Sequence, residues 1–200
     1  MDDLDSTASL LRPLLVSKTR AKLLSLFLNN PGKIFYVREL VRAVGEQINA
    51  VRAELARLEK AGMVSSEARA NRKFFGFRKD YVFQAELAKI IAKASGLGGE
   101  IIHERNRLGK IKFAALTTGF IWRRSVGPAD VDLLVVGNVV LPQLAALVKK
   151  AEDTIGREVN YTVMNEDEFT FRKRRKDPFV SGILERIGVV LIGDEEELVR

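Results

Sequence analysis

The spacing of apolar residues divides the first half of the chain into helices and one charged hairpin. Apolar positions three or four apart predict helices at 17–28, 37–44, 47–61 and 82–95, with a short edge strand at 34–36. Residues 64–68 and 73–78 predict two strands that flank a tip at 69–72. Gly45 predicts a turn between two of the helices, and Gly62 predicts the end of the second of them. We therefore expect a helix, a turn, a basic helix and then a hairpin.

Two of these helices carry apolar stripes that predict which faces are buried. In the helix at 47–61 the stripe consists of Ile48, Val51, Leu55 and Leu58. In the helix at 82–95 it consists of Leu87, Ile90, Ile91 and Ala94. The remaining faces of 47–61 and the turn before it carry amides and basic side chains, together with Glu46, Glu54 and Glu59. A polar face of this composition predicts a surface that meets another molecule.

The second half of the chain alternates between predicted strands and helices. Strands are predicted at 112–117, 131–136, 158–164 and 189–192, and helices at 100–110 and 141–155. The segment Asn165–Glu168 resembles a capping box and predicts a further helix start. Alternating strands and helices predict a small α/β domain. We expect an α/β chain of the α+β kind, with a DNA-binding domain at 1–80, a linker and dimerisation helix at 81–99 that includes the glycine-rich linker 96–99, and a mixed-sheet domain at 100–200.

Composition excludes several classes of protein. The chain has 200 residues, 46% of them hydrophobic, and a mean hydropathy near zero, as expected for a globular protein. No apolar run is long enough to span a bilayer, and the acidic N-terminus does not resemble a signal peptide, so we expect a cytoplasmic location. The absence of cysteine excludes disulfides and thiolate metal sites. A single histidine, His103, argues against a histidine-rich metal site or a Ser-His-Asp triad.

The net charge of +7 is concentrated in the first 80 residues. They hold 15 lysines and arginines against 9 acidic residues, whereas residues 101–200 hold 16 against 15. A basic excess beside the predicted pair of helices is what a polyanion-binding surface requires. A second basic run, 172–176, predicts a solvated helix face, although a nucleic-acid contact or an anion site is an alternative for it.

The first half resembles the winged helix-turn-helix family of prokaryotic transcriptional regulators, over residues 17–95. The resemblance is carried by Val51–Val64, which looks like a recognition helix running into a wing, and by Ala70–Phe75 in the wing. It implies that Gln47, Asn49 and Arg52 face base edges or nearby phosphates in the major groove. It also implies that four wing residues contact the DNA backbone or the minor groove: Arg69, Asn71, Arg72 and Lys73.

The same segment has a second interpretation as a protein–protein module. Glu46, Glu54 and Glu59 would repel phosphate if they pointed towards it. The stretch 68–79 contains no acidic residue, and this favours double-stranded DNA as the partner.

The second half resembles a minimal nucleotidyltransferase domain over residues 112–193. In that family an Asp-x-Asp pair on a strand binds Mg²⁺, and Asp130 and Asp132 match the pair. The chain departs from the family where Thr117–Phe120 replaces the Gly-Ser motif, and where Asn160 stands in the region of the third acid. The resemblance therefore implies a domain that has lost catalysis and uses no cofactor, with a vestigial Mg²⁺ and ATP site at Asp130 and Asp132.

Together these patterns predict a homodimeric, sequence-specific regulator whose second domain senses a small-molecule effector or contacts a protein. The first predicted helix, at 17–28, and the helix at 82–95 are the expected dimer surfaces. One alternative is an active Mg²⁺-dependent nucleotidyltransferase that the winged helix delivers to its target. A further alternative is the antitoxin of a toxin–antitoxin pair.

Overall fold

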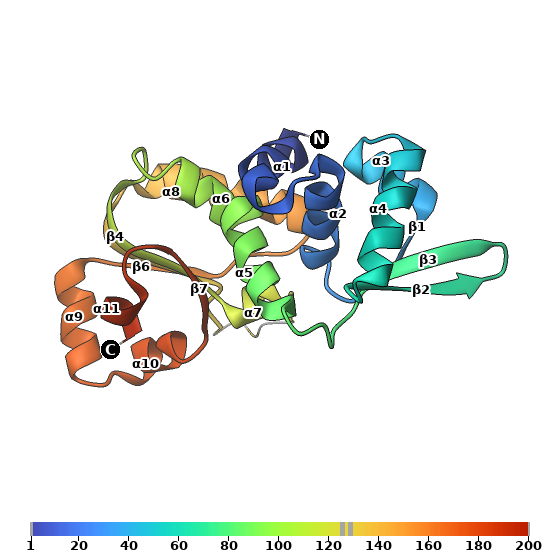
Figure 1. Cartoon of the computed structure of the whole chain (residues 1–200). Coiled ribbons are helices and arrows are strands. Elements are labelled where there is room, and N and C mark those ends of the chain that lie inside the picture. Colours follow the sequence, from blue (N-terminus) through green and yellow to red (C-terminus); the bar gives the residue numbers. More distant parts are fainter. Residues whose placement is uncertain (1, 125–126, 128–129, 200) are drawn as a thin grey trace. The chain divides into compact units, whose positions relative to one another are not determined.

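The computed structural model describes residues 2–124, 127 and 130–199, and the chain divides into two compact units, Met1–Ser95 and Gly96–Arg200 (Figure 1). Unit 1 contains, in order, α1 (Asp2–Leu15), α2 (Lys18–Leu28), β1 (Phe35–Tyr36), α3 (Val37–Val44), α4 (Ile48–Lys60), β2 (Val64–Arg69), β3 (Arg72–Phe77) and α5 (Gln84–Ala94). The helices at 17–28, 37–44 and 47–61 and the hairpin are confirmed to within a few residues. The mixed composition of helices and strands agrees with the expected fold class.

Helix α1 was not predicted, because its segment is rich in Asp, Ser and Thr and contains Pro13. Tertiary contacts stabilise it instead. Ala8 and Leu11 are buried, and α1 packs against α2 and α5. The Thr7 hydroxyl also donates a hydrogen bond to the Ala94 carbonyl at 3.1 Å. Helix α5 therefore belongs to the core of unit 1.

The three strands of unit 1 form an antiparallel sheet in the order β1-β3-β2. Phe35 lies opposite Phe75, and Arg69 lies opposite Arg72 across the tip of the hairpin. Phe27 of α2 meets Phe35 edge to face, with ring centroids 5.9 Å apart. The sheet thereby joins the start of α3 to the hairpin, although the two are far apart in sequence.

The stripe predicted for α4 is correct at three of its four positions. Val51, Leu55 and Leu58 are buried, but Ile48 is 37% exposed because it is the first residue of the helix and lies before the part that packs. The helix ends as expected, since Gly62 has a φ of +72° and its N–H bonds to the Glu59 carbonyl. In α5, Ile91 and Ala88 are buried, whereas Ile90, expected inside, is 39% exposed.

Unit 2 is built on a four-stranded mixed sheet. Its elements are α6 (Gly96–His103), β4 (Gly109–Thr117), α7 (Thr118–Ile121), β5 (Leu133–Val139), α8 (Leu141–Ile155), β6 (Tyr161–Met164), α9 (Glu166–Arg174), α10 (Pro178–Leu184), β7 (Ile187–Ile192) and α11 (Glu195–Val199). The strand order is β6-β5-β4-β7, with β5 and β6 parallel and the other pairs antiparallel. Phe113, Leu134, Met164 and Phe169 lie in one core cluster of this unit.

Several predictions for this half need correction. The glycine-rich segment 96–99, expected as a linker, begins helix α6, and the helix expected at 100–110 ends at His103. The strand expected at 131–136 runs from Leu133 to Val139 and so continues past Gly137. Strand β6 begins only at Tyr161. The cap at Asn165 is confirmed, because its side chain accepts a hydrogen bond from the Glu168 N–H at 2.7 Å.

Among the described residues, no helix combines the length and the apolar character needed to cross a bilayer.

Gly137 provides a test of the sheet in unit 2. Its φ is +140°, and a Cβ there would collide with the Lys110 carbonyl oxygen on the neighbouring strand. We expect Gly137→Ala to lower the free energy of unfolding by about 3 kcal/mol, measured by urea denaturation. Gly182→Ala is the matched control, because a Cβ there meets no atom within 4 Å and the site is helical. Equal stabilities of the two variants would contradict this account.

Candidate nucleic-acid interface

The predicted contact residues lie on α4 and on the β2–β3 hairpin of unit 1. Gln47 is the N-cap of α4, and Asn49 and Arg52 follow within its first two turns. All three side chains are exposed. The other four predicted residues lie at the exposed end of the hairpin: Arg69, Asn71, Arg72 and Lys73. The fold thus presents two exposed polar sets, one on a helix and one on a hairpin.

Glu54 fixes α4 against α2. It was expected on a polar face, but it is only 4% exposed. Its carboxylate accepts hydrogen bonds from Arg20 Nε at 3.0 Å and from Arg57 Nη1 at 2.6 Å. Burial alone would raise the pKa of Glu54, but the hydrogen bonds from these two arginines hold it below its ordinary value. Glu54 therefore points into the unit and carries no unpaired charge towards a ligand.

Glu46 is paired in a similar way at the turn before α4. Lys22, which is 2% exposed, donates to Glu46 Oε1 at 2.8 Å and to the Val44 carbonyl at 3.0 Å. The same ammonium group lies 2.7 Å from Asp5 Oδ1. Hydrogen bonds from Lys18 and Lys22 lower the pKa of Asp5 to about 2. This network joins α1 and α2 to the turn and neutralises the second acid.

Glu59 is the third acid, and the hairpin neutralises it. Its carboxylate accepts hydrogen bonds from the Ser66 hydroxyl and from Lys73 Nζ, the latter at 3.1 Å. These bonds, with Ser66 contributing most, lower the pKa of Glu59. The three glutamates that would oppose a polyanion are therefore all bound by cations of the same unit.

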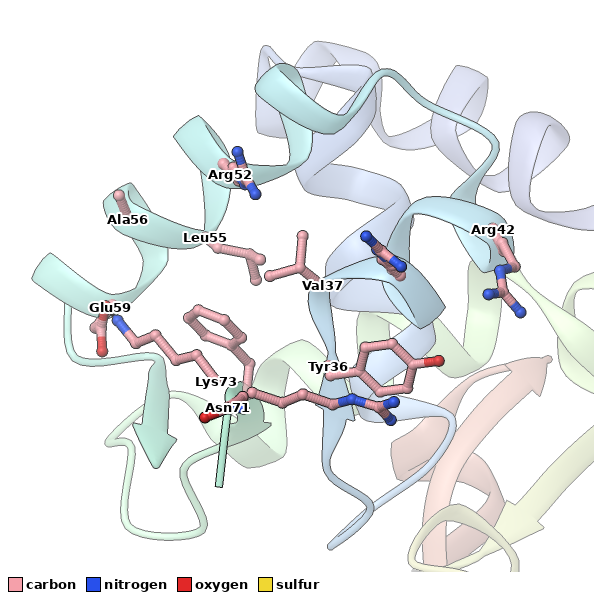
Figure 2. A pocket seen from close by; sticks show the side chains of 12 residues that line it. Tyr36, Val37, Arg42, Arg52, Leu55, Ala56, Glu59, Asn71 and Lys73 are labelled. Atoms are coloured by element: carbon pink, nitrogen blue, oxygen red, sulfur yellow. Dashed lines mark hydrogen bonds and ion pairs between the residues drawn. The ribbon is translucent and has the colours of Figure 1, made fainter. Parts of the chain in front are cut away.

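A groove of about 740 Å³ lies between α3, α4 and the hairpin (Figure 2). Figure 2 shows Arg52 and Arg42 on opposite sides of this groove, with Leu55 and Val37 between them. The apolar part of the lining consists of Val37, Leu55, Ala56 and Phe75. The cations that line it are Arg38, Arg42, Arg52, Arg72 and Lys73. Glu59 is the acidic residue of the lining.

Three polar lining residues were not singled out from the sequence: Tyr36, Arg38 and Arg42. The helix at 37–44 was predicted without any contact residue, and nothing local in the sequence indicates that the hairpin lies beside it. The pairing of β1 with β3 creates this proximity. The spacing of Arg38 and Arg42 was the signal in the sequence that could have indicated a shared cationic surface, since residues four apart share a helix face.

Aromatic rings position the cations of the hairpin. The Arg72 guanidinium lies over the Tyr36 ring, 4.8 Å from its centroid, and Arg69 lies 5.8 Å from the centroid of Phe74. Tyr36 and Phe74 meet edge to face at 5.9 Å, directly across the β1–β3 pair. Stacking of this kind restricts an arginine without neutralising it. The groove therefore offers oriented positive charge, which suits phosphate groups.

In unit 2 the predicted metal ligand Asp132 is fully buried and bound by an arginine. Arg157 donates to Asp132 Oδ2 at 2.8 Å and to Oδ1 at 3.0 Å, and the Asn160 backbone N–H donates to Oδ2 at 3.1 Å. The hydrogen bond with Asp132 raises the pKa of Arg157. Both carboxylate oxygens are therefore engaged by protein donors.

Asp130 is bound by different partners. It accepts hydrogen bonds from the Gly127 N–H, at 2.9 Å, and from Arg186, and these bonds lower its pKa, with Gly127 contributing most. Both aspartates precede β5, so the expectation that they lie on the strand was wrong. Within 2–124, 127 and 130–199, no cluster of three or more His, Cys, Asp or Glu residues could hold a metal ion.

The basic run 172–176 is largely engaged within unit 2. Arg172 pairs with Glu168 at 2.9 Å, and Lys173 donates to the carbonyls of Glu197 and Leu198 at 2.8 and 2.9 Å. Arg175 lies over the Phe171 ring at 5.3 Å. These contacts favour the interpretation of this run as a structural, solvated face.

Replacing Glu54 tests the anchor of α4. We expect Glu54→Gln to lower the free energy of unfolding at pH 7 by about 2 kcal/mol, because it removes the anion from two arginines, one of which is mostly exposed. The pKa of Glu54 is lowered by folding, so its contribution is present above its ordinary pKa of 4.5 and disappears on further acidification.

The difference between wild type and Glu54→Gln should therefore shrink below about pH 4.5 in urea titrations. Glu86→Gln, at an exposed position on α5, is the control and should change stability by less than about 0.5 kcal/mol. A difference that stays constant from pH 7 to acid would contradict the ionic role of Glu54.

A second replacement tests the buried pair of unit 2. Arg157→Met leaves the Asp132 carboxylate buried without its cation, so we expect a loss of about 3–5 kcal/mol in urea unfolding. Adding Asp132→Asn removes that charge and keeps an acceptor for the Asn160 N–H, so the double variant should recover part of the loss. A double variant no more stable than Arg157→Met would show that the charge is not the cause.

Comparison with protein-family models and with curated protein sequences gives no match for this chain.

Proposed function

We propose that this chain is a sequence-specific, DNA-binding transcriptional regulator, with unit 1 as its winged helix-turn-helix. The observation that carries the proposal is the charge arrangement around α4. Glu46, Glu54 and Glu59 are each bound by a cation, while Arg38, Arg42 and Arg52 have no hydrogen-bond or ion-pair partner among the described residues. Unpaired guanidinium groups gathered on one groove suit a polyanionic partner.

The dimensions and chemistry of α4 suit the major groove of B-form DNA. The helix has 13 residues, and a helix is narrow enough to enter a groove about 12 Å wide. Its N-terminal half presents Gln47, Asn49 and Arg52, and its opposite face is buried. Amides pair bidentately with adenine, and arginine pairs bidentately with guanine. In this proposal these three residues read bases.

The hairpin acts as the wing, and its cations differ in availability. Arg69 pairs with Glu67 at 2.6 Å, and Lys73 pairs with Glu59 at 3.1 Å. Arg72 stacks on Tyr36 and has no acidic partner among the described residues. Arg72 is therefore the main phosphate contact of the wing, while Arg69, Asn71 and Lys73 contribute less.

Dimerisation would let the chain bind two half-sites of one operator. The apolar side chains Leu23, Leu24, Phe27 and Leu28 of the helix at 17–28, an expected dimer surface, are buried in unit 1. Exposed apolar side chains lie instead on α1, directly before α5 and on α5: Leu10, Leu14, Val82, Phe83 and Ile90. These residues are the proposed surface for a second copy of the chain.

Unit 2 would act as a degenerate nucleotidyltransferase-like domain for effector sensing or protein contact, since Arg157 occupies the Asp132 carboxylate.

The first experiment selects bound fragments from genomic DNA with the purified full chain at physiological salt. We expect enrichment of a motif with two half-sites. Unenriched binding that fades evenly as salt rises would reduce unit 1 to a non-specific or protein-docking module.

The base-reading role is tested by measuring affinities of variants for the selected site and for single-base changes of it. Arg52→Ala should cost about 1–3 kcal/mol and relax preference at one base position. Arg72→Gln should weaken binding to all sequences alike. Arg105→Ala, an exposed substitution in unit 2, should leave affinity unchanged. If Arg52→Ala retained full discrimination at every position, α4 would not read bases through this residue.

A further inference from the structure

The groove of unit 1 carries an arginine pair on α3 that base reading by α4 does not use. Arg38 and Arg42 are four residues apart, so they lie on the same face of α3, and both line the groove. Both are exposed, and neither has a hydrogen-bond or ion-pair partner within the part of the chain that the structure describes. Their charges are therefore available to a ligand without breaking an internal contact.

The opposite side of the groove is also cationic. Arg72 of the wing lies over the Tyr36 ring at 4.8 Å, and Tyr36 directly precedes α3. Lys73 lies at the same edge, where it holds Glu59, as Figure 2 shows. The acidic residue of the lining is thus already neutralised, and a ligand between α3 and the wing meets positive charge on both sides.

The floor of the groove is apolar. Val37 and Leu55 lie between Arg42 and Arg52 (Figure 2), and Ala56 and Phe75 complete the apolar lining. A sugar–phosphate strand has the matching pattern, because its deoxyribose faces are largely apolar and its phosphates carry the charge. A free anion would use the cations but would leave this floor without a partner. The combination favours a strand over a small ion.

From this geometry we infer that the groove holds one sugar–phosphate strand of the bound DNA, with Arg38 and Arg42 of α3 neutralising phosphates opposite the wing. The inference rests on the proposed function and deepens it. It assigns α3 to backbone contact, beside base reading by α4. It also makes Tyr36 a positioning residue, which acts through Arg72.

The experiment measures the affinity of the full chain for its selected duplex between about 50 and about 200 mM salt. Each phosphate contact contributes about −0.9 to the slope of log affinity against log salt. Arg38→Gln/Arg42→Gln should therefore make the slope shallower by about 2, so the variant loses about tenfold less affinity than wild type over that range. Discrimination between bases should be unchanged.

The matched control is Arg105→Gln/Arg107→Gln, which removes the same charge from exposed positions in unit 2. It should keep the wild-type slope. Tyr36→Phe keeps the ring under Arg72 and should bind DNA as wild type does. Tyr36→Leu removes the ring and should make the slope shallower by about 1. Thermal unfolding of each variant establishes that it is folded.

The two failures are distinguishable. If wild type does not bind DNA, the proposed function fails. If wild type binds and Arg38→Gln/Arg42→Gln keeps the wild-type slope, the groove inference is overturned while the regulator proposal stands. A slope that becomes equally shallow in the unit 2 control would also overturn it, because the effect would then be one of net charge alone. A slope that becomes shallower only in the α3 variant supports the groove inference.

Discussion

The arrangement of unit 1 depends on the burial of one carboxylate. Glu54 lies between Arg20 of α2 and Arg57 of its own helix, at 3.0 and 2.6 Å, and is almost completely shielded from water. A buried carboxylate is costly unless it is paired, so this contact allows few alternative orientations of α4. Because the orientation of α4 is fixed, its N-terminal side chains and the hairpin that follows it reach solvent together. The groove exists as a consequence.

The neighbouring acids follow the same logic. Lys22 and Lys73 bind Glu46 and Glu59, so the acidic residues of this segment become part of the scaffold. These acids are therefore occupied by internal partners and do not neutralise the arginines of the groove. Three arginines that have no hydrogen-bond or ion-pair partner among the described residues, Arg38, Arg42 and Arg52, line one groove, and this supports a single extended anionic partner.

In unit 2 an arginine holds the carboxylate that was predicted as a metal ligand. Arg157 binds both oxygens of the buried Asp132, and this pairing offsets the cost of burying the carboxylate charge. Asp130 is held by Gly127 and Arg186. The two aspartates, adjacent in the motif, are thus bound by separate partners, and this favours a structural role for each.

The sequence by itself determined the local structure of unit 1. Apolar spacing predicted α2, α3 and α4, Gly62 predicted the end of α4, and the exposed positions of Gln47, Asn49 and Arg52 followed from the same periodicity. These features depend on neighbours within a few residues, so they are present in the local pattern.

Tertiary structure decided the rest. Only the fold pairs β1 with β3 and brings Arg38 and Arg42 to the wing, and only the fold buries Glu54 and Asp132 beside arginines distant in sequence. Such contacts arise from packing between distant segments, which no periodicity records.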